Sequence, residues 1–153
     1  TMFRSRLNEA LKEAMRSKNQ RAVSTLRLIL AALKDRDIAA RGRGVTDGID
    51  EDEILSMLQT MIKQRREAIA LYEQGGRLEL AEQEREEIGV IETFLPKQFS
   101  EDEIRGAVDT VIKDIGATGI KDMGRTMAEL RTRYAGQMDF GKASGLVKAA
   151  LAG

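Results

Sequence analysis

The residues with the clearest chemical potential are basic and lie near the C-terminus. Lys121 and Arg125 are four positions apart in the stretch GIKDMGRTM, so a helix there would present both side chains on one face. The N-terminus of such a helix also offers unpaired backbone N–H groups to a phosphate. We call this predicted phosphate-binding surface the C-terminal basic surface. It consists of Lys121, Arg125, Arg131, Arg133, Lys142 and Lys148.

Gly124 lies between the first two of these cations and has two explanations. Its missing side chain would let a nucleic-acid backbone approach closely, or it would let two helices pack closely. The second explanation is at least as good as the first.

A second basic stretch, KQRR, covers residues 63–66. On a helix, Lys63 and Arg66 point outward and are candidates for a further phosphate contact. Arg65 lies near the apolar stripe instead. We expect it to pair with a carboxylate of a neighbouring helix, such as Glu87 or Asp37.

The composition argues against most catalytic chemistry. The 153 residues include no Cys and no His, which removes the thiolate nucleophile and the commonest general base. The acidic run Asp50–Glu53 is typical of a helix cap rather than a metal site. We predict no catalytic residue, no metal and no cofactor, although two carboxylates could still meet in the fold. Aromatic residues make up only 4% of the chain, so base stacking is not expected.

The charge is balanced overall but unevenly distributed. Residues 1–43 hold eleven Lys and Arg against four Asp and Glu, a net charge of +7, whereas residues 79–92 are acidic. The ordinary explanation is that these charges line the solvated faces of helices. No apolar run approaches a membrane span, and charges interrupt every apolar stretch near the N-terminus. We therefore expect a cytoplasmic protein without a signal peptide.

The elements that position these residues are predicted to be helices only. Apolar residues recur at helical spacing from Phe3 onward, and no stretch alternates with the period of a strand. Ser100 with Glu103 forms a capping box, Thr118 could cap a sixth helix and Asp139 a seventh. The predicted fold class is all-α, with a four-helix N-terminal domain and a small three-helix C-terminal domain.

The boundary between these domains is predicted at the only proline. Pro96 disfavours helix at the preceding residue, so the fourth helix should end at Leu95. The predicted organisation is a domain over 2–95, a junction over 96–99 and a domain over 100–153.

Several motifs, in one order along the chain, resemble the GatB/YqeY family. They are LRLILAALKDRDI (26–38), IKQRREAI (62–69), YEQGGRLELAEQEREEI (72–88), FLPKQFSEDEI (94–104), GATGIKDMGRTM (116–127) and DFGKASGLVKAAL (139–151). The similarity covers nearly the whole chain and is that of a stand-alone YqeY protein. The loop RGRGVTDGIDEDE is longer than usual for the family, and Gly119 stands where Ser or Ala is more common.

This resemblance implies a relation to the tail domain of the B subunit of the tRNA-dependent amidotransferase. That tail is implicated in gripping tRNA, while the carbon–nitrogen ligase chemistry, with glutamine as amido donor, belongs to another domain. The expected function is thus a non-catalytic module that binds tRNA or another RNA through phosphate contacts. The expected partner is tRNA or a tRNA-processing or amidotransferase assembly. The alternative is a protein-interaction adaptor using an apolar patch near Phe99, Met138 or Phe140. A ligase activity is a less favoured third possibility.

Overall fold

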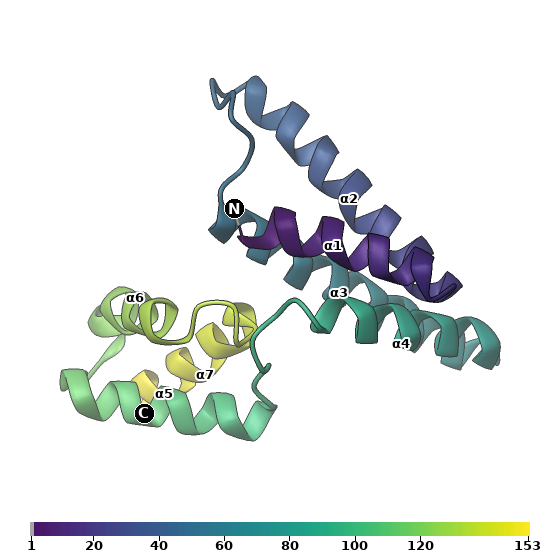
Figure 1. Cartoon of the computed structure of the whole chain (residues 1–153). Helices are drawn as coiled ribbons and strands as arrows, with labels where there is room; N and C mark the ends of the chain where they lie inside the picture. The colour runs from purple at the N-terminus through teal and green to yellow at the C-terminus, as the bar shows by residue number, and fades with distance from the viewer. Residues whose placement is uncertain (1) are drawn as a thin grey trace. The chain divides into compact units, whose positions relative to one another are not determined.

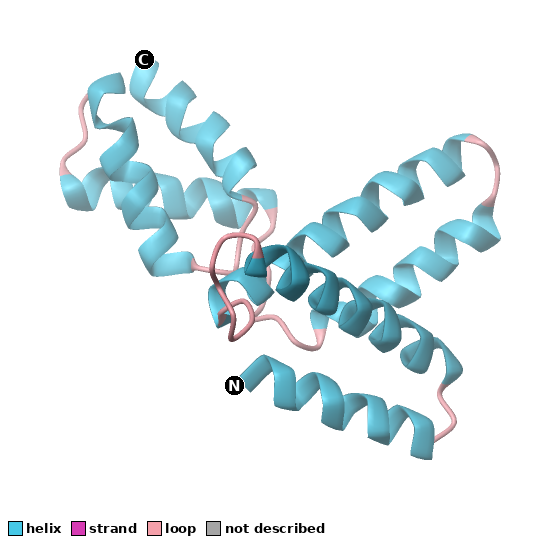
Figure 2. Cartoon of the chain, turned by 90° about the horizontal axis from the view of Figure 1, so that it is seen from above, coloured by secondary structure: helices cyan, strands magenta, loops and turns pink. Residues whose placement is uncertain are grey.

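The computed structural model describes residues 2–153, and in that range all regular structure is helical (Figures 1 and 2). Seven α-helices and one short 3₁₀ helix occur there, with no strand, so the all-α prediction is confirmed. Contacts group the helices into two compact units, one ending at Leu95 and the other beginning at Pro96. Whether each unit folds alone, as two domains would, stays a prediction. No helix in the described range has the length and apolar character needed to cross a membrane.

The first unit contains four helices around one core. They are α1 (Met2–Arg16), α2 (Gln20–Arg41), α3 (Glu51–Gln74) and α4 (Leu78–Glu92). Helices α3 and α4 form a hairpin, α1 packs on α2 and α3, and α2 also contacts α4 (Figure 1). Each helix is amphipathic, so burying its apolar stripe against the others supplies most of its stability.

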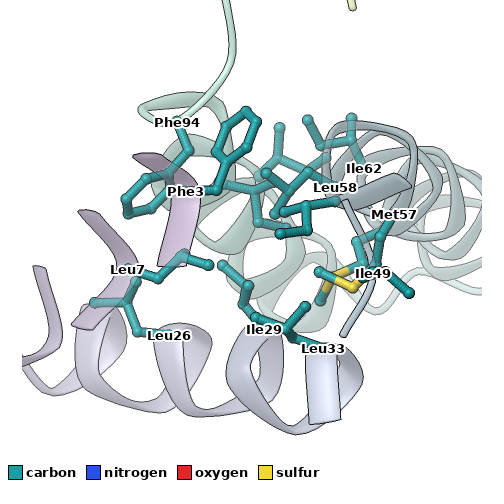
Figure 3. Close-up of a cluster of buried hydrophobic side chains, with 14 of the residues drawn as sticks. Phe3, Leu7, Leu26, Ile29, Leu33, Ile49, Met57, Leu58, Ile62 and Phe94 are labelled. Carbon is teal, nitrogen blue, oxygen red and sulfur yellow. The ribbon is translucent and has the colours of Figure 1, made fainter. Parts of the chain in front are cut away.

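The core of the first unit draws on every one of its helices. Figure 3 shows large apolar side chains of α1 and α2 gathered with those of α3 and of the segment after α4. Ile49, from the loop before α3, is only 3% exposed and closes one side of this core. The labelled core residues are Phe3, Leu7, Leu26, Ile29, Leu33, Ile49, Met57, Leu58, Ile62 and Phe94.

The fourth helix ends earlier than predicted. Helix α4 stops at Glu92, whereas the proline had suggested Leu95. The hydroxyl of Thr93 donates to the Val90 carbonyl at 2.7 Å, and the backbone N–H of Leu95 donates to the Glu92 carbonyl in a turn. This turn places Phe94 in the core at 6% exposure. The prediction was therefore wrong by one turn, because side-chain and packing interactions end the helix before Pro96 does.

The second unit is a three-helix arrangement with its own core. It contains α5 (Glu101–Ile115), the 3₁₀ helix η1 (Ile120–Asp122), α6 (Met123–Tyr134) and α7 (Phe140–Ala152). The three α-helices contact one another, and η1 contacts both α6 and α7. Its most buried apolar residues are Ile104, Val108, Val111, Leu130, Met138, Ala143 and Val147.

Capping explains where the helices of this unit begin, with one exception. Ser100 and Glu103 form the predicted capping box, with both reciprocal hydrogen bonds present at 3.2 and 2.9 Å. Asp139 caps α7 as predicted, accepting from two backbone N–H groups. Thr118 does not cap α6, so that prediction was wrong. Its backbone N–H instead donates to the carboxylate of Asp122, which lies at the start of α6.

Candidate nucleic-acid interface

The structure places the predicted C-terminal basic surface on three elements of the second unit. Lys121 belongs to η1, and Arg125 lies in the first turn of α6. Arg131 and Arg133 lie in the last turn of α6. Lys142 and Lys148 belong to α7. The arginines and the lysines of this set have different surroundings, which decides how each could be used.

Arg133 is held by two carboxylates. Its guanidinium donates to Asp114 of α5 at 2.7 Å and to Glu129 one turn earlier on α6 at 2.8 Å. The hydrogen bond to Asp114, followed by that to Glu129, raises the pKa of Arg133 above its usual range. The positive charge is thus matched locally, and the side chain joins α5 to α6.

Arg125 has a structural task in the loop that precedes α6. It donates to the Ile115 carbonyl at the end of α5 at 2.9 Å and to Asp122 at 3.3 Å. The carboxylate of Asp122 also accepts from the backbone N–H of Thr118, and this bond is the main cause of the lowered pKa of Asp122. A negative charge therefore occupies the start of α6, where the sequence had suggested room for a phosphate. Arg125 fastens α6 to the end of α5.

Gly124, between these residues, does not serve close helix packing. A Cβ atom built at this position would meet no heavy atom within 4 Å, and the residue is exposed. The explanation by close helix–helix packing was therefore wrong.

The three lysines differ from these arginines. Lys121, Lys142 and Lys148 are exposed, and none has a carboxylate within 4.0 Å in residues 2–153. Lys142 and Lys148 are six residues apart, which separates them by about 120° around α7. They therefore lie on different sides of that helix. Arg131 is intermediate, because its guanidinium lies over the ring of Phe140, 5.7 Å from the centroid.

The basic stretch of the first unit is divided in the same way. Arg65 contacts Glu87 at 3.6 Å and Glu84 at 3.9 Å across the α3–α4 hairpin, so pairing with Glu87 is confirmed. Arg66 reaches Glu92 at 3.5 Å on the surface. Lys63 is exposed and has no such partner in the described part of the chain.

Two charged clusters were not identified from the sequence. The first is the carboxylate pair Glu84 and Glu87, three residues apart on α4 beside Arg65. Burial, with repulsion from Glu87, raises the pKa of Glu84. The spacing of three residues was a visible signal, but nothing in the sequence showed that this face of α4 would be buried.

The second cluster holds the loop before α3 in place. Asp37, the other predicted partner of Arg65, instead accepts two hydrogen bonds from Arg4, at 2.8 and 2.9 Å. It also accepts from the backbone N–H of Ile49 at 2.9 Å, while Arg4 donates to the Ile49 carbonyl at 3.0 Å. We call this set, Arg4, Asp37 and the backbone of Ile49, the loop clamp. Within residues 2–153 no group of three or more His, Cys, Asp or Glu side chains could hold a metal ion.

The patch suggested for a protein adaptor is not exposed as expected. Met138 is 2% exposed and belongs to the core of the second unit. Phe99 and Phe140 are half-buried, and Phe99 packs against Tyr134 with 5.2 Å between ring centroids. Most of the apolar surface predicted there is therefore buried in the core of the second unit.

These features define the class of protein: over residues 2–153 it is an all-helical protein of two compact units, and the lysines of the candidate interface are exposed. A family model described as Yqey-like protein matches residues 4–151, so the chain belongs to the YqeY-like family.

Curated relatives from yeasts support the same assignment. The chain is 29% identical over 111 residues to "Altered inheritance of mitochondria protein 41, mitochondrial" of Lachancea thermotolerans, covering 71% of this chain and 57% of the relative. The protein of that name from Vanderwaltozyma polyspora is 28% identical over 123 residues, covering 76% and 64%. That from Eremothecium gossypii is 25% identical over 149 residues, covering 95% and 79%. The match thus spans less than two thirds of the first two relatives.

These names also correct the predicted location. The sequence was expected to be that of a cytoplasmic protein, but the relatives are named as mitochondrial proteins. The cytoplasmic prediction is therefore contradicted.

Proposed function

We propose that this protein is a helical module that binds RNA of the tRNA type through phosphate contacts and has no chemistry of its own. The observation that carries the proposal is the set of exposed lysines in the second unit, Lys121, Lys142 and Lys148, which have no carboxylate within 4.0 Å in the described chain. A cation without a protein partner can release counterions from a nucleic acid at no cost in broken ion pairs.

Two further points support phosphate contacts over base readout. The resemblance to the tail of the amidotransferase B subunit favours tRNA as the nucleic acid. Aromatic residues are 4% of the chain, and those of the second unit are half-buried against its core, so few rings are free to stack on bases. Phosphate positions and the shape of the RNA would then decide what binds.

The test is a gel-shift titration of the full chain with tRNA at several salt concentrations. The triple variant Lys121→Ala, Lys142→Ala, Lys148→Ala should bind more weakly, because it neutralises fewer phosphates. Its affinity should also depend less steeply on salt, by up to about 0.7–0.9 in log–log slope for each phosphate that the variant no longer neutralises.

A matched control removes equally charged side chains that already have partners. Lys12 lies 3.6 Å from Glu9, and Lys97 lies 3.6 Å from Glu103. Arg16 lies 2.8 Å from Glu13. The variant Lys12→Ala, Arg16→Ala, Lys97→Ala, which also removes three charges, should leave tRNA binding nearly unchanged. Failure of the wild type to bind at about 50 mM salt, where phosphate contacts are strong, would refute the proposal. An equal loss of affinity in the control would show that only net charge matters.

A further inference from the structure

Helix α2 carries cations at a seven-residue interval. Arg27, Lys34 and Arg41 are exposed, and each is two helical turns from the next, a rise of about 10.5 Å. None of them has a carboxylate within 4.0 Å among residues 2–153. They therefore form a line of unmatched positive charge on one side of the first unit.

Apolar side chains lie between these cations. Leu30 is half-buried and Ile38 is 49% exposed, and both fall within the same helical stripe as Lys34. We call Arg27, Leu30, Lys34, Ile38 and Arg41 the α2 stripe. The apolar side chains of this stripe remain in contact with water, and a partner that covered them would remove this unfavourable contact.

A depression of about 330 Å³ adjoins the stripe, and helices α1 and α2 form it together. Arg4 and Asn8 line its α1 side, while Lys34 and Arg41 contribute to its α2 side. Asp37 also lines it, but its carboxylate is already bound bidentately by Arg4 in the loop clamp. Arg41 attracts Asp37 only at longer range, which contributes to the lowered pKa of Asp37, and neither Lys34 nor Arg41 forms an ion pair within 4.0 Å among residues 2–153.

We propose that the α2 stripe and this depression dock an acidic amphipathic α-helix of a partner protein. A helix with carboxylates every seven residues repeats its charge at about 10.5 Å, the same interval as Arg27, Lys34 and Arg41. Apolar side chains one turn away from those carboxylates would cover Leu30 and Ile38, as in other complexes in which a helix lies along a groove. Electrostatic attraction would orient the partner, and the apolar contacts would slow its release.

Other anionic partners match this surface less well. A nucleic-acid backbone offers nothing apolar to cover Ile38, and no aromatic side chain lines the depression to stack on a base. An anionic membrane would suit a helix with its apolar and basic residues on opposite faces, whereas here they alternate along one stripe. An acidic helix is the partner that uses both kinds of side chain together.

The experiment uses the full chain and a synthetic helical peptide of about 21 residues, with Glu at every seventh position and Leu one turn after each Glu. Fluorescence anisotropy should show saturable binding to the wild type. The exposed charge reversals Lys34→Glu and Arg41→Glu together should weaken it by at least about tenfold. The matched reversals Lys18→Glu and Lys113→Glu, at exposed lysines outside α2, should leave binding within about twofold of wild type.

A charge swap separates specific docking from general attraction. The same peptide with Lys in place of Glu should bind the Lys34→Glu, Arg41→Glu protein and not the wild type. Ile38→Ser should weaken binding of the acidic peptide to the wild type and of the basic peptide to the Lys34→Glu, Arg41→Glu protein, because both complexes bury the Ile38 side chain. The proposal is overturned if the wild type does not bind the acidic peptide, or if the control reversals weaken binding equally. It is also overturned if the Lys34→Glu, Arg41→Glu protein loses tRNA or anionic-vesicle binding while peptide binding persists. Failure of the tRNA proposal, which concerns lysines of the second unit, would leave the peptide-binding and vesicle-binding outcomes unaffected.

Discussion

The substitution Asp37→Asn tests the loop clamp most directly. The Asp37 carboxylate accepts three hydrogen bonds, two from the Arg4 guanidinium and one from the Ile49 backbone N–H. Asparagine has a similar shape, but it has no charge and can present only one acceptor oxygen. We expect the substitution to lower the free energy of unfolding of the first unit by about 1–2 kcal/mol at pH 7.

This magnitude follows from the pKa of Asp37. The hydrogen bond from Arg4 is the largest cause that lowers it from the usual 3.8 to about 2. At about 1.36 kcal/mol for each pH unit between folded and unfolded pKa values, the charge contributes at most about 2.5 kcal/mol. The side chains of Arg4 and Asp37 are 28% and 21% exposed, so solvent screens part of this. The lower range of about 1–2 kcal/mol takes account of that screening.

The pH dependence has a definite sign. Because the folded pKa is lower than the unfolded one, the stabilisation is complete above about pH 5 and is lost as the pH falls from about 4 toward 2. The wild type and Asp37→Asn should therefore differ by a constant amount at neutral pH. The difference should shrink in acid, because protonation neutralises Asp37 in the wild type as well.

Urea unfolding at a series of pH values, with amide exchange of Ile49 as a local probe, measures this difference. Glu53→Gln is a suitable control, since Glu53 pairs with Arg43 at 3.4 Å on the exposed surface and should contribute less than about 0.5 kcal/mol. A deficit of Asp37→Asn that stays constant down to about pH 2.5 would refute the charge as its origin. Equal stability of wild type and variant at pH 7 would refute the clamp itself.

Four further substitutions test two other features of the first unit. Gly48 and Gly44 both have positive φ angles, 88° and 84°, but a Cβ at Gly48 would lie 2.6 Å from a nitrogen of the loop clamp, whereas one at Gly44 would meet nothing. Backbone strain should lower the free energy of unfolding of both alanine variants by about 1–2 kcal/mol. In thermal unfolding, Gly48→Ala should lose clearly more stability than Gly44→Ala, because its Cβ also collides with Arg4 of the loop clamp. Equal losses would mean that the loop clamp adjusts freely. Glu84→Gln should raise stability at pH 7 by up to about 1 kcal/mol, because burial and Glu87 raise the pKa of Glu84 and so disfavour its charged form. The difference in stability between Glu84→Gln and the wild type should close as the pH falls through the pKa of Glu84, and an unchanged difference in urea unfolding at acid pH would contradict this. Glu87→Gln should instead destabilise the protein, because it leaves Arg65 without its nearer carboxylate.

The sequence predicted the helices well where short-range interactions decide their ends. The Ser100–Glu103 box and the Asp139 cap use hydrogen bonds between residues at most three apart, so their pattern is visible in the sequence. Gly116 ends α5 with a left-handed φ of 67°, which glycine adopts readily. The prediction of a helix cap failed where more than one local hydrogen-bonding arrangement was possible. Thr118 could have capped α6, but its backbone N–H and that of Gly119 donate to the carboxylate of Asp122, and no side chain caps the start of α6.

The candidate interface was harder to predict, because the use of a cation depends on what lies opposite it. Arg133 meets Asp114 from 19 residues away, and Arg4 meets Asp37 from 33 residues away. Neither separation follows a helical interval, so no local pattern could indicate that these charges would be matched. Arg65 was predicted correctly only because its position on the apolar side of α3 requires some carboxylate partner.

These pairings change the interpretation of the basic segment at the N-terminus. Its net charge of +7 suggested ordinary solvated helix faces, and for Lys12 and Arg16, paired with acids on the same helix, that explanation holds. Lys34 and Arg41 are exposed as well, but they border a depression that Leu30, Leu33 and Ile38 also line, and the carboxylate there, Asp37, is already bound by Arg4. Unmatched cations beside exposed apolar area cost the isolated protein both self-repulsion and unfavourable hydration. Both costs are removed by a single acidic, amphipathic partner, whereas a phosphate alone would remove only the first.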